Sequence, residues 1–254
     1  MKNAKPLLLI IILTTIACGS VQPEEGTSTN ISHESWNELL NKHVDKYGNV
    51  NYQGFKIDSS ALIEYLSLLS NNLPSNSWTD QQQLAYWINV YNAFTIKLII
   101  DHYPISSIKD IGSRIQIPFV NTPWQIEFIK LGERNYDLDN IEHDIIRQKF
   151  NEPRIHFALV CAAKSCPNLR NEAYESNKLE TQLADQTVRF LADTSKNKIM
   201  EKQLKLSKIF RWYKQDFTKS TQLIEYINQY TYIEINVAAE IDYLDYDWRL
   251  NESQ

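Results

Sequence analysis

Side chains of the kinds used in thiol catalysis occur in separate segments of the sequence: Asn89, Asn92, His143, His156 and Cys166. The thiolate is the reactive form of cysteine, and histidine is its common base. In Cys-His-Asn hydrolases an amide side chain orients the histidine or donates to the oxyanion. We therefore consider Cys166 as a nucleophile, His143 as its base, and Asn89 or Asn92 as the orienting amide. His156 is the alternative base, and the sequence does not choose between the two histidines.

The neighbours of Cys166 support this hypothesis. Lys164 and Arg170 lie close to it in the sequence. Nearby cations lower the pKa of a thiol from its free value of about 8.5 and so increase the reactive fraction.

A second interpretation of Cys166 is structural. Cys161 lies five residues earlier, and outside the cytoplasm two such cysteines are able to form a disulfide. The disulfide would then make the loop between them rigid and leave no free thiol to act as a nucleophile. The sequence leaves both interpretations open.

The chain is rich in aromatic residues, with 14 Tyr and 6 Trp. Four tryptophans, Trp87, Trp124, Trp212 and Trp248, either pack in the core or in part line a groove for a glycan or peptide, because flat amphipathic rings give a large contact area at a low entropy cost. The side chains that we assign to binding are Trp87, Glu142, His156 and Arg170.

Other site chemistries are not favoured. Cys161, Cys166, His143 and His156 are zinc-ligand types, but a C-x4-C pair with both histidines upstream matches no standard finger spacing, so we expect no metal. The 6 glycines form no phosphate-binding motif, and we expect no cofactor. The net charge of −5, with basic residues scattered along the chain, argues against a nucleic-acid partner.

The element that must position the amides is a long helix over residues 79–102. Thr79 and Gln82 form a capping-box pattern, and apolar side chains on nearly every face predict a helix that is buried all round. Asn89 and Asn92 lie three apart and project from one side. Buried amides need partners, so these two either hold neighbouring loops or line a site.

The remaining segments predict an α+β fold. Asp139 with Glu142 forms a second capping-box pattern opening a helix through Phe150, and residues 155–161 have the composition of a buried strand. We expect a strand over residues 124–129, a helix over 176–193 and a hairpin over 198–206. Helix exceeds strand, so the sequence predicts a helix-rich single domain around the long buried helix, with a small sheet built from hairpins.

The first residues have the pattern of a secretory signal. Lys2 and Lys5 precede an apolar run over residues 7–13 that is too short to span a membrane. The small residues before Cys18 resemble the lipobox of bacterial lipoproteins. We therefore predict a signal peptide over residues 1–17, then a palmitate-type lipid anchor on Cys18 and a flexible tether over 18–34.

Five sequence blocks resemble, in order, those of the family named domain of unknown function 547: residues 86–93, 139–143, 156–167, 209–217 and 246–251. The resemblance covers roughly residues 35–251, which we predict to be one globular domain. It implies a bacterial envelope protein and does not imply a reaction.

Taken together, these features predict an extracytoplasmic lipoprotein attached to the membrane through Cys18, with the outer membrane favoured over the inner. Its Asn/His/Cys site would bind or process an envelope peptide or glycan, or bind a protein partner. The alternative is a thiol-dependent hydrolase or acyl transferase with a Cys-His-Asn arrangement. The sequence does not decide whether the protein is an enzyme.

Overall fold

The computed structural model describes residues 23–27, 30–112 and 122–253. The predicted signal peptide and Cys18 lie outside these ranges. Within them the fold is α+β, as predicted, with many helices and two small sheets. No helix in the described part of the chain is long and apolar enough to cross a membrane.

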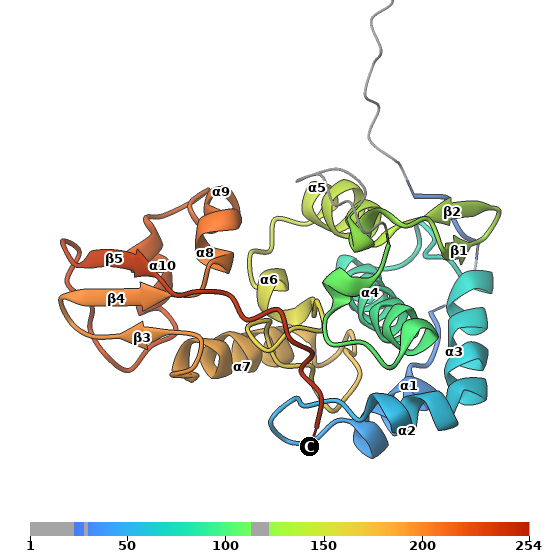
Figure 1. Ribbon diagram of the computed structural model, residues 1–254. Helices are drawn as coiled ribbons and strands as arrows, with labels where there is room; N and C mark the ends of the chain where they lie inside the picture. The colour runs from blue at the N-terminus through green and yellow to red at the C-terminus, as the bar shows by residue number, and fades with distance from the viewer. Residues whose placement is uncertain (1–22, 28–29, 113–121, 254) are drawn as a thin grey trace, which may run out of the picture.

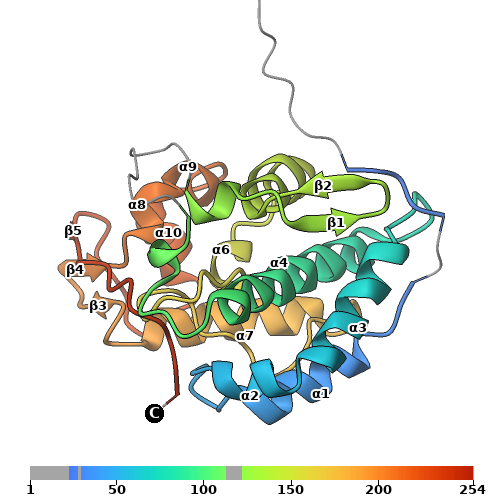
Figure 2. The same ribbon diagram turned by 45° about the vertical axis from the view of Figure 1, so that its right-hand side comes forward.

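The first half of the domain consists of helices packed around α4. These are α1 (Glu34–His43), α2 (Tyr52–Ile57), α3 (Ser59–Asn71) and α4 (Asp80–His102), followed by the single turn η1 (Ile108–Asp110). Figures 1 and 2 show α4 in the middle of this part of the molecule, with α3, α7 and the β1–β2 hairpin around it.

The predicted capping box of α4 is confirmed. Thr79 Oγ1 accepts from the Gln82 N–H, and the Gln82 side chain accepts from the Thr79 N–H. The helix has no polar stripe, and most of its residues are buried. A helix buried on every side fixes the position of each of its polar side chains, and this makes Asn89 and Asn92 rigid reference points for the chain that surrounds them.

A hairpin of β1 (Ile129–Leu131) and β2 (Arg134–Tyr136) lies beside α4 and turns at Gly132. The strand predicted over residues 124–129 is wrong for most of its length. Pro123–Gln125 forms a 3-10 turn, η2, because Pro123 at the first position fixes its φ in the helical range.

The next helix spans η3 (Asn140–Ile146), which has π-helical hydrogen bonding, and α5 (Arg147–Lys149). The capping box predicted from Asp139 and Glu142 is wrong. Asp137 caps this helix instead, since its carboxylate accepts from the Asn140 N–H while the Asn140 side chain accepts from the Asp137 N–H. The shift of two residues releases Glu142 from the cap and leaves its carboxylate available for other contacts.

The strand predicted over residues 155–161 is also wrong. Ile155–Ala158 forms a single helical turn, α6, and an extended stretch follows it. A short apolar run fits a buried strand and a buried helical turn equally well, so periodicity alone does not separate the two.

The last part of the chain forms a smaller layer around α7 (Leu179–Ala192), at the left of Figure 1. Its sheet has the order β3-β4-β5, formed by Lys198–Ile199, Gln203–Leu206 and Glu240–Tyr243. The β3–β4 hairpin was predicted, whereas β5 joins β4 in parallel and was not. The helices α8 (Ile209–Trp212), α9 (Lys214–Phe217) and α10 (Leu223–Asn228) complete this layer.

The C-terminal segment joins the two parts of the molecule. From β5 it runs back past α6 and ends near α2 (Figure 1). Asn251 donates its N–H to the Ala162 carbonyl, and its own carbonyl accepts from the Val50 N–H. The last residues of the chain therefore hold the loop that contains both described cysteines.

Part of the segment predicted as a tether lies against the domain. The Glu24 N–H donates to the Tyr136 hydroxyl at 3.0 Å, and the Gly26 N–H donates to the Pro74 carbonyl at 2.9 Å. A Cβ on Gly26 would be 1.9 Å from the Leu73 carbonyl oxygen, so only glycine fits this close approach.

Candidate functional site

Ionisable side chains from three helices converge beside α4. Glu142, His143 and Arg147 come from the η3–α5 helix, His156 from α6, and Asp216 from α9. We call these five residues the polar cluster. The π-helical turn carries two of them, and such turns occur frequently at functional sites.

Asp216 is the anchor of the polar cluster. One carboxylate oxygen accepts from Arg147 Nε at 2.7 Å and from His156 Nε2 at 2.7 Å. Burial alone would raise the pKa of Asp216, but these two hydrogen bonds outweigh it and hold the pKa well below its ordinary value. Asp216 is therefore ionised at neutral pH.

His156 is almost completely buried, and burial lowers its pKa despite the hydrogen bond to Asp216. The neutral ring uses Nε2–H to donate to Asp216, so Nδ1 is the unprotonated nitrogen. The Tyr213 ring stacks on this imidazole with the centroids 3.8 Å apart. These contacts fix both the tautomer and the orientation of His156.

His143 is the accessible histidine, with 39% of its side chain exposed. The Arg147 guanidinium lies 2.9 Å from its Nδ1. Because a guanidinium only donates hydrogen bonds, Nδ1 must be the acceptor. The neutral ring then carries its proton on Nε2, which lies 3.9 Å from an Asp139 oxygen. Burial raises the pKa of Asp139 to about 6.

Glu142 lies between the two histidines. One of its oxygens is 3.9 Å from His156 Nδ1 and 4.0 Å from His143 Nδ1. Its side chain is 9% exposed and accepts hydrogen bonds from the hydroxyls of Tyr91 and Tyr213. Burial and the nearby carboxylate raise the pKa of both phenols, so they remain hydrogen-bond donors.

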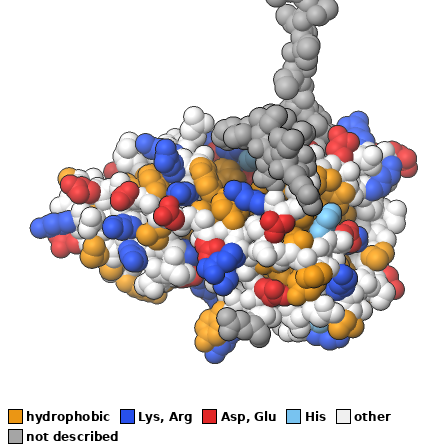
Figure 3. All heavy atoms as spheres, in the orientation of Figure 1, with side chains coloured by type: hydrophobic (Ala, Val, Ile, Leu, Met, Phe, Trp, Pro, Cys, Tyr) orange, Lys and Arg blue, Asp and Glu red, His pale blue; other side chains and the backbone are white. Residues whose placement is uncertain are grey.

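Aromatic rings gather at the surface next to the polar cluster. Trp248 contacts Trp124, Trp212 and Tyr246, with ring centroids 5.7, 6.0 and 4.6 Å away. We call these four residues the aromatic platform. Trp212 is 48% exposed, and Lys109 Nζ lies 4.3 Å from the centroid of Trp248. Figure 3 shows hydrophobic side chains reaching the surface in the middle of the molecule, between its two ends.

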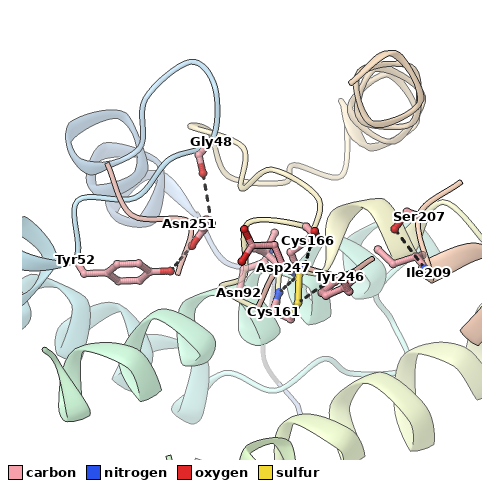
Figure 4. Close-up of a disulfide and its surroundings, with 12 residues drawn as sticks. Gly48, Tyr52, Asn92, Cys161, Cys166, Ser207, Ile209, Tyr246, Asp247 and Asn251 are labelled. Atoms are coloured by element: carbon pink, nitrogen blue, oxygen red, sulfur yellow. Dashed lines mark hydrogen bonds between the residues drawn. A yellow bond between two sulfur atoms is a disulfide. The ribbon is translucent and has the colours of Figure 1, made fainter. Parts of the chain in front are cut away.

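Tyr246 links the aromatic platform to the two cysteines. Its hydroxyl lies 3.3 Å from Cys161 Sγ, and the negative charge of Glu142 adds to burial in raising its pKa. Cys161 and Cys166 form a disulfide in the structure, with their Cα atoms 5.9 Å apart. Figure 4 shows this disulfide beside Tyr246, Asn92 and Asp247.

The structure does not assemble the Cys-His-Asn arrangement considered above. Both sulfur atoms are in the disulfide, and the described contacts of His143 and His156 are with carboxylates, Arg147 and aromatic rings. A thiol nucleophile next to a base is thus not present in this arrangement.

The two amides of α4 hold loops. Asn89 donates to the Tyr174 carbonyl at 2.8 Å and accepts from the Tyr174 N–H at 3.0 Å. Asn92 makes the same pair of contacts with the Ala158 carbonyl and the Val160 N–H, at 2.9 and 3.0 Å. Each amide thereby satisfies one backbone donor and one acceptor, and neither contacts a histidine through these bonds.

Trp87 and Arg170, which were predicted to bind a ligand, are not members of the polar cluster or of the aromatic platform. Trp87 is 1% exposed and packs edge-on against Tyr86 in the core. Arg170 forms ion pairs with Glu172 and Asp185, and its side chain is 10% exposed. These contacts give both residues a structural role in the observed arrangement.

Sequence reasoning missed Arg147, Tyr213, Asp216 and Tyr246. Tyr213 and Asp216 fall in a block of residues 209–217 where polar side chains alternate with large aromatic ones, and this unusual mixture is the signal that was available. In the part of the chain that the structure describes, no three His, Cys, Asp or Glu side chains are arranged to hold a metal ion.

Comparison with known protein families finds a match to part of the chain. The sequence pattern of the family described as "Protein of unknown function, DUF547" matches residues 75–191. This stretch contains α4, the π-helical turn, α6 and both cysteines of the disulfide, but not Tyr213, Asp216 or the platform residues Trp212, Tyr246 and Trp248. No curated protein and no solved structure matches the chain.

Proposed function

Because residues 75–191 match the DUF547 family, whose description names no reaction, we propose a function from the chain's own residues: it is an extracytoplasmic, lipid-anchored envelope protein that binds a glycan. The observation that carries the proposal is the aromatic platform beside the polar cluster. Flat rings at a surface and a few polar groups at their edge form the usual composition of a small-molecule or oligosaccharide site.

The ring geometry favours a glycan over a peptide. A sugar ring presents C–H groups on its face, and these meet the electron-rich face of an aromatic ring. Trp212 and Trp248 are stacked, with their planes 27° apart, and Trp212 is 48% exposed, so Trp212 offers an accessible ring at the surface. An exposed ring suits the face of a sugar ring, whereas peptide recognition needs a strand edge or a groove for side chains.

The polar cluster supplies hydrogen-bonding groups at the edge of the platform. The Nε2–H of His143 is a donor, as derived above from the contact with Arg147. Glu142 is an acceptor whose orientation is fixed by two phenols. Sugar hydroxyls both donate and accept, so a donor and an acceptor on rigid elements can bind and orient one ring of a glycan.

The extracytoplasmic location rests on the sequence. The apolar run over residues 7–13 and the small residues before Cys18 support export and lipidation. The chain would then be attached to the bacterial membrane through palmitate-type lipid on Cys18, at the outer membrane in a Gram-negative cell. This location would place the aromatic platform among envelope glycans.

The binding proposal is tested with the full chain in detergent. The probes are oligosaccharides of N-acetylglucosamine and of glucose, and an uncharged tetrapeptide, with affinity measured by calorimetry and by tryptophan fluorescence. We expect at least one oligosaccharide to bind. Trp212→Ala should weaken that binding by about 2 kcal/mol, or about 30-fold, because large aromatic side chains dominate such sites.

The matched control is Tyr232→Ala, since Tyr232 is 98% exposed and is not part of the aromatic platform. This variant should bind like the wild type. Equal affinity of the Trp212 and Tyr232 variants would contradict the proposal. Binding of the tetrapeptide alone would show that the ligand class is wrong.

The anchor is tested separately in cells. We expect an alkynyl palmitate analogue to label the wild type and to leave Cys18→Ser unlabelled, with the variant no longer in the membrane fraction. The control is Cys161→Ser, which should keep the label. Labelling that survives Cys18→Ser would refute the anchor and leave the glycan test unaffected.

A further inference from the structure

We propose that Cys161 and Cys166 form a redox-active pair that exchanges electrons with dithiols, with Cys161 as the sulfur that the partner's thiolate attacks. The proposal concerns the loop over residues 161–166 and does not depend on glycan binding. Four features of this loop support the proposal. The two cysteines are buried to different extents, and a backbone N–H donates a hydrogen bond to the sulfur that would leave. Hydrogen bonds that do not involve the disulfide hold the loop in place, and one residue between the cysteines has an unfavourable backbone conformation.

The two cysteine residues are buried to different extents. Cys161 is half-buried at the surface, next to the Tyr246 hydroxyl, whereas Cys166 is 3% exposed. Exchange requires a thiolate to reach one sulfur, so attack is directed to Cys161. The Tyr246 hydroxyl, 3.3 Å from Cys161 Sγ, is positioned to donate a hydrogen bond to this sulfur when it carries negative charge.

The leaving sulfur has a hydrogen-bond donor in place. The Cys161 N–H lies 2.7 Å from Cys166 Sγ. A backbone donor at this distance stabilises a thiolate more than a disulfide sulfur, because hydrogen bonds to charged acceptors are stronger. It therefore favours Cys166 as the sulfur that leaves when Cys161 is attacked, and a thiolate of lower pKa leaves faster.

The loop is held by contacts that do not involve the disulfide. Its backbone is joined to α4 and to the C-terminal segment by hydrogen bonds of the Val160 N–H to Asn92, the Asn251 N–H to Ala162, the Lys164 N–H to Arg249 and the Ser165 N–H to Asp247. These bonds remain when the S–S bond opens. Both sulfurs should then stay close enough to close again, which a reversible redox pair requires.

Ala162, directly after Cys161, has a φ of 59°. A non-glycine residue in this left-handed region is uncommon and unfavourable, so the surrounding structure must impose it. Such residues cluster at functional sites. Here the residue lies in the short loop that brings Cys161 and Cys166 together.

The thiol–disulfide exchange takes place in two steps. A partner thiolate attacks Cys161 Sγ, an S–S bond forms between them, and the Cys161–Cys166 bond breaks with its electron pair on Cys166. The partner's second thiol then loses its proton and attacks the partner sulfur of the mixed disulfide, which releases Cys161 as a thiolate. The partner dithiol is oxidised by two electrons, its two protons pass to Cys161 and Cys166, and a second partner that carries a disulfide reverses the steps.

The test uses the full chain with Cys18→Ser, so that only the two cysteines of the pair are counted. The oxidised protein is incubated with dithiothreitol, and free thiols are mapped by alkylation and mass measurement. We expect reduction at a rate that does not change with urea below the unfolding transition, with circular dichroism of the folded state retained. In the reduced protein Cys161 should alkylate at least about tenfold faster than Cys166.

Two further variants give the direction of attack. With Cys166→Ser, glutathione disulfide should form a stable mixed disulfide on Cys161. With Cys161→Ser, the buried Cys166 should react at least about tenfold more slowly. Reduction only at the rate of unfolding, or equal reactivity of the two cysteines, would overturn the proposal. Because the first measurement uses the intact pair, it decides the question even if neither variant folds.

Discussion

Replacing Asn92 by alanine tests whether this amide holds the loop before the disulfide. The change removes the acceptor of the Val160 N–H and the donor to the Ala158 carbonyl, both in buried residues. A buried polar group without a partner costs about 1–3 kcal/mol, so the two together cost roughly 2–6 kcal/mol.

One feature of the structure reduces this cost. Asn92 borders a small hollow that is also lined by Tyr52, Thr95 and Asn251. Their polar groups could hold a water molecule in the space left by the amide, and a bridging water recovers part of the lost hydrogen bonding. We therefore expect a loss near 3 kcal/mol in the free energy of unfolding, and a fall in Tm of about 6–12 °C.

The assay is urea and thermal unfolding followed by circular dichroism. The matched control is Asn41→Ala, because the Asn41 amide donates to a carbonyl on an exposed helix surface. Its effect should stay within about 0.5 kcal/mol. A loss below about 1 kcal/mol for Asn92→Ala, similar to the control, would refute a structural role for this amide.

Three other predictions concern charge and close contact. Asp216→Asn should lower the free energy of unfolding by roughly 2–4 kcal/mol, because the hydrogen-bond donors Arg147 and His156, which are half-buried and buried, lose their carboxylate partner. The control Asp245→Ala removes a surface carboxylate and should lower it by less than about 0.5 kcal/mol. Burial lowers the pKa of His33 from 6.5 to about 4, so its contribution is complete above pH 6.5 and is lost as the pH falls toward 4. Urea unfolding at pH 7 and pH 4 should therefore show a pH-dependent loss that is smaller in His33→Gln by roughly 3 kcal/mol, and an equal loss in both proteins would contradict the assignment. Gly26→Ala should displace residues 23–27 from Leu73 and increase their amide hydrogen exchange without changing exchange in α4; unchanged exchange in residues 23–27 would show that the contact is not formed.

Local sequence signals were sufficient where one segment determines its own structure. The Thr79–Gln82 capping box and the apolar residues on every face were enough to place α4 and to show that it is buried. The same reasoning failed at Asp139, where Asp137 two residues earlier makes the cap. Several neighbouring residues can cap a helix, and the choice depends on where the preceding strand β2 ends.

The convergence of distant segments was not predictable. His156 and Asp216 are 60 residues apart, and no pattern in either segment indicates that their side chains meet. The sequence also named both partners of the disulfide but left their bonding open, because the spacing of two cysteines does not fix the path of the loop between them.

The sequence by itself thus determined the long buried helix, the α+β class, the resemblance to a family and the residue types available for a site. Only the tertiary structure decided that Asn92 holds a loop, that Glu142 lies between two histidines, and that surface tryptophans from distant segments form one platform. The physical reason is range: caps and periodicity act within a few residues, whereas these contacts depend on how helices far apart in the chain pack against α4.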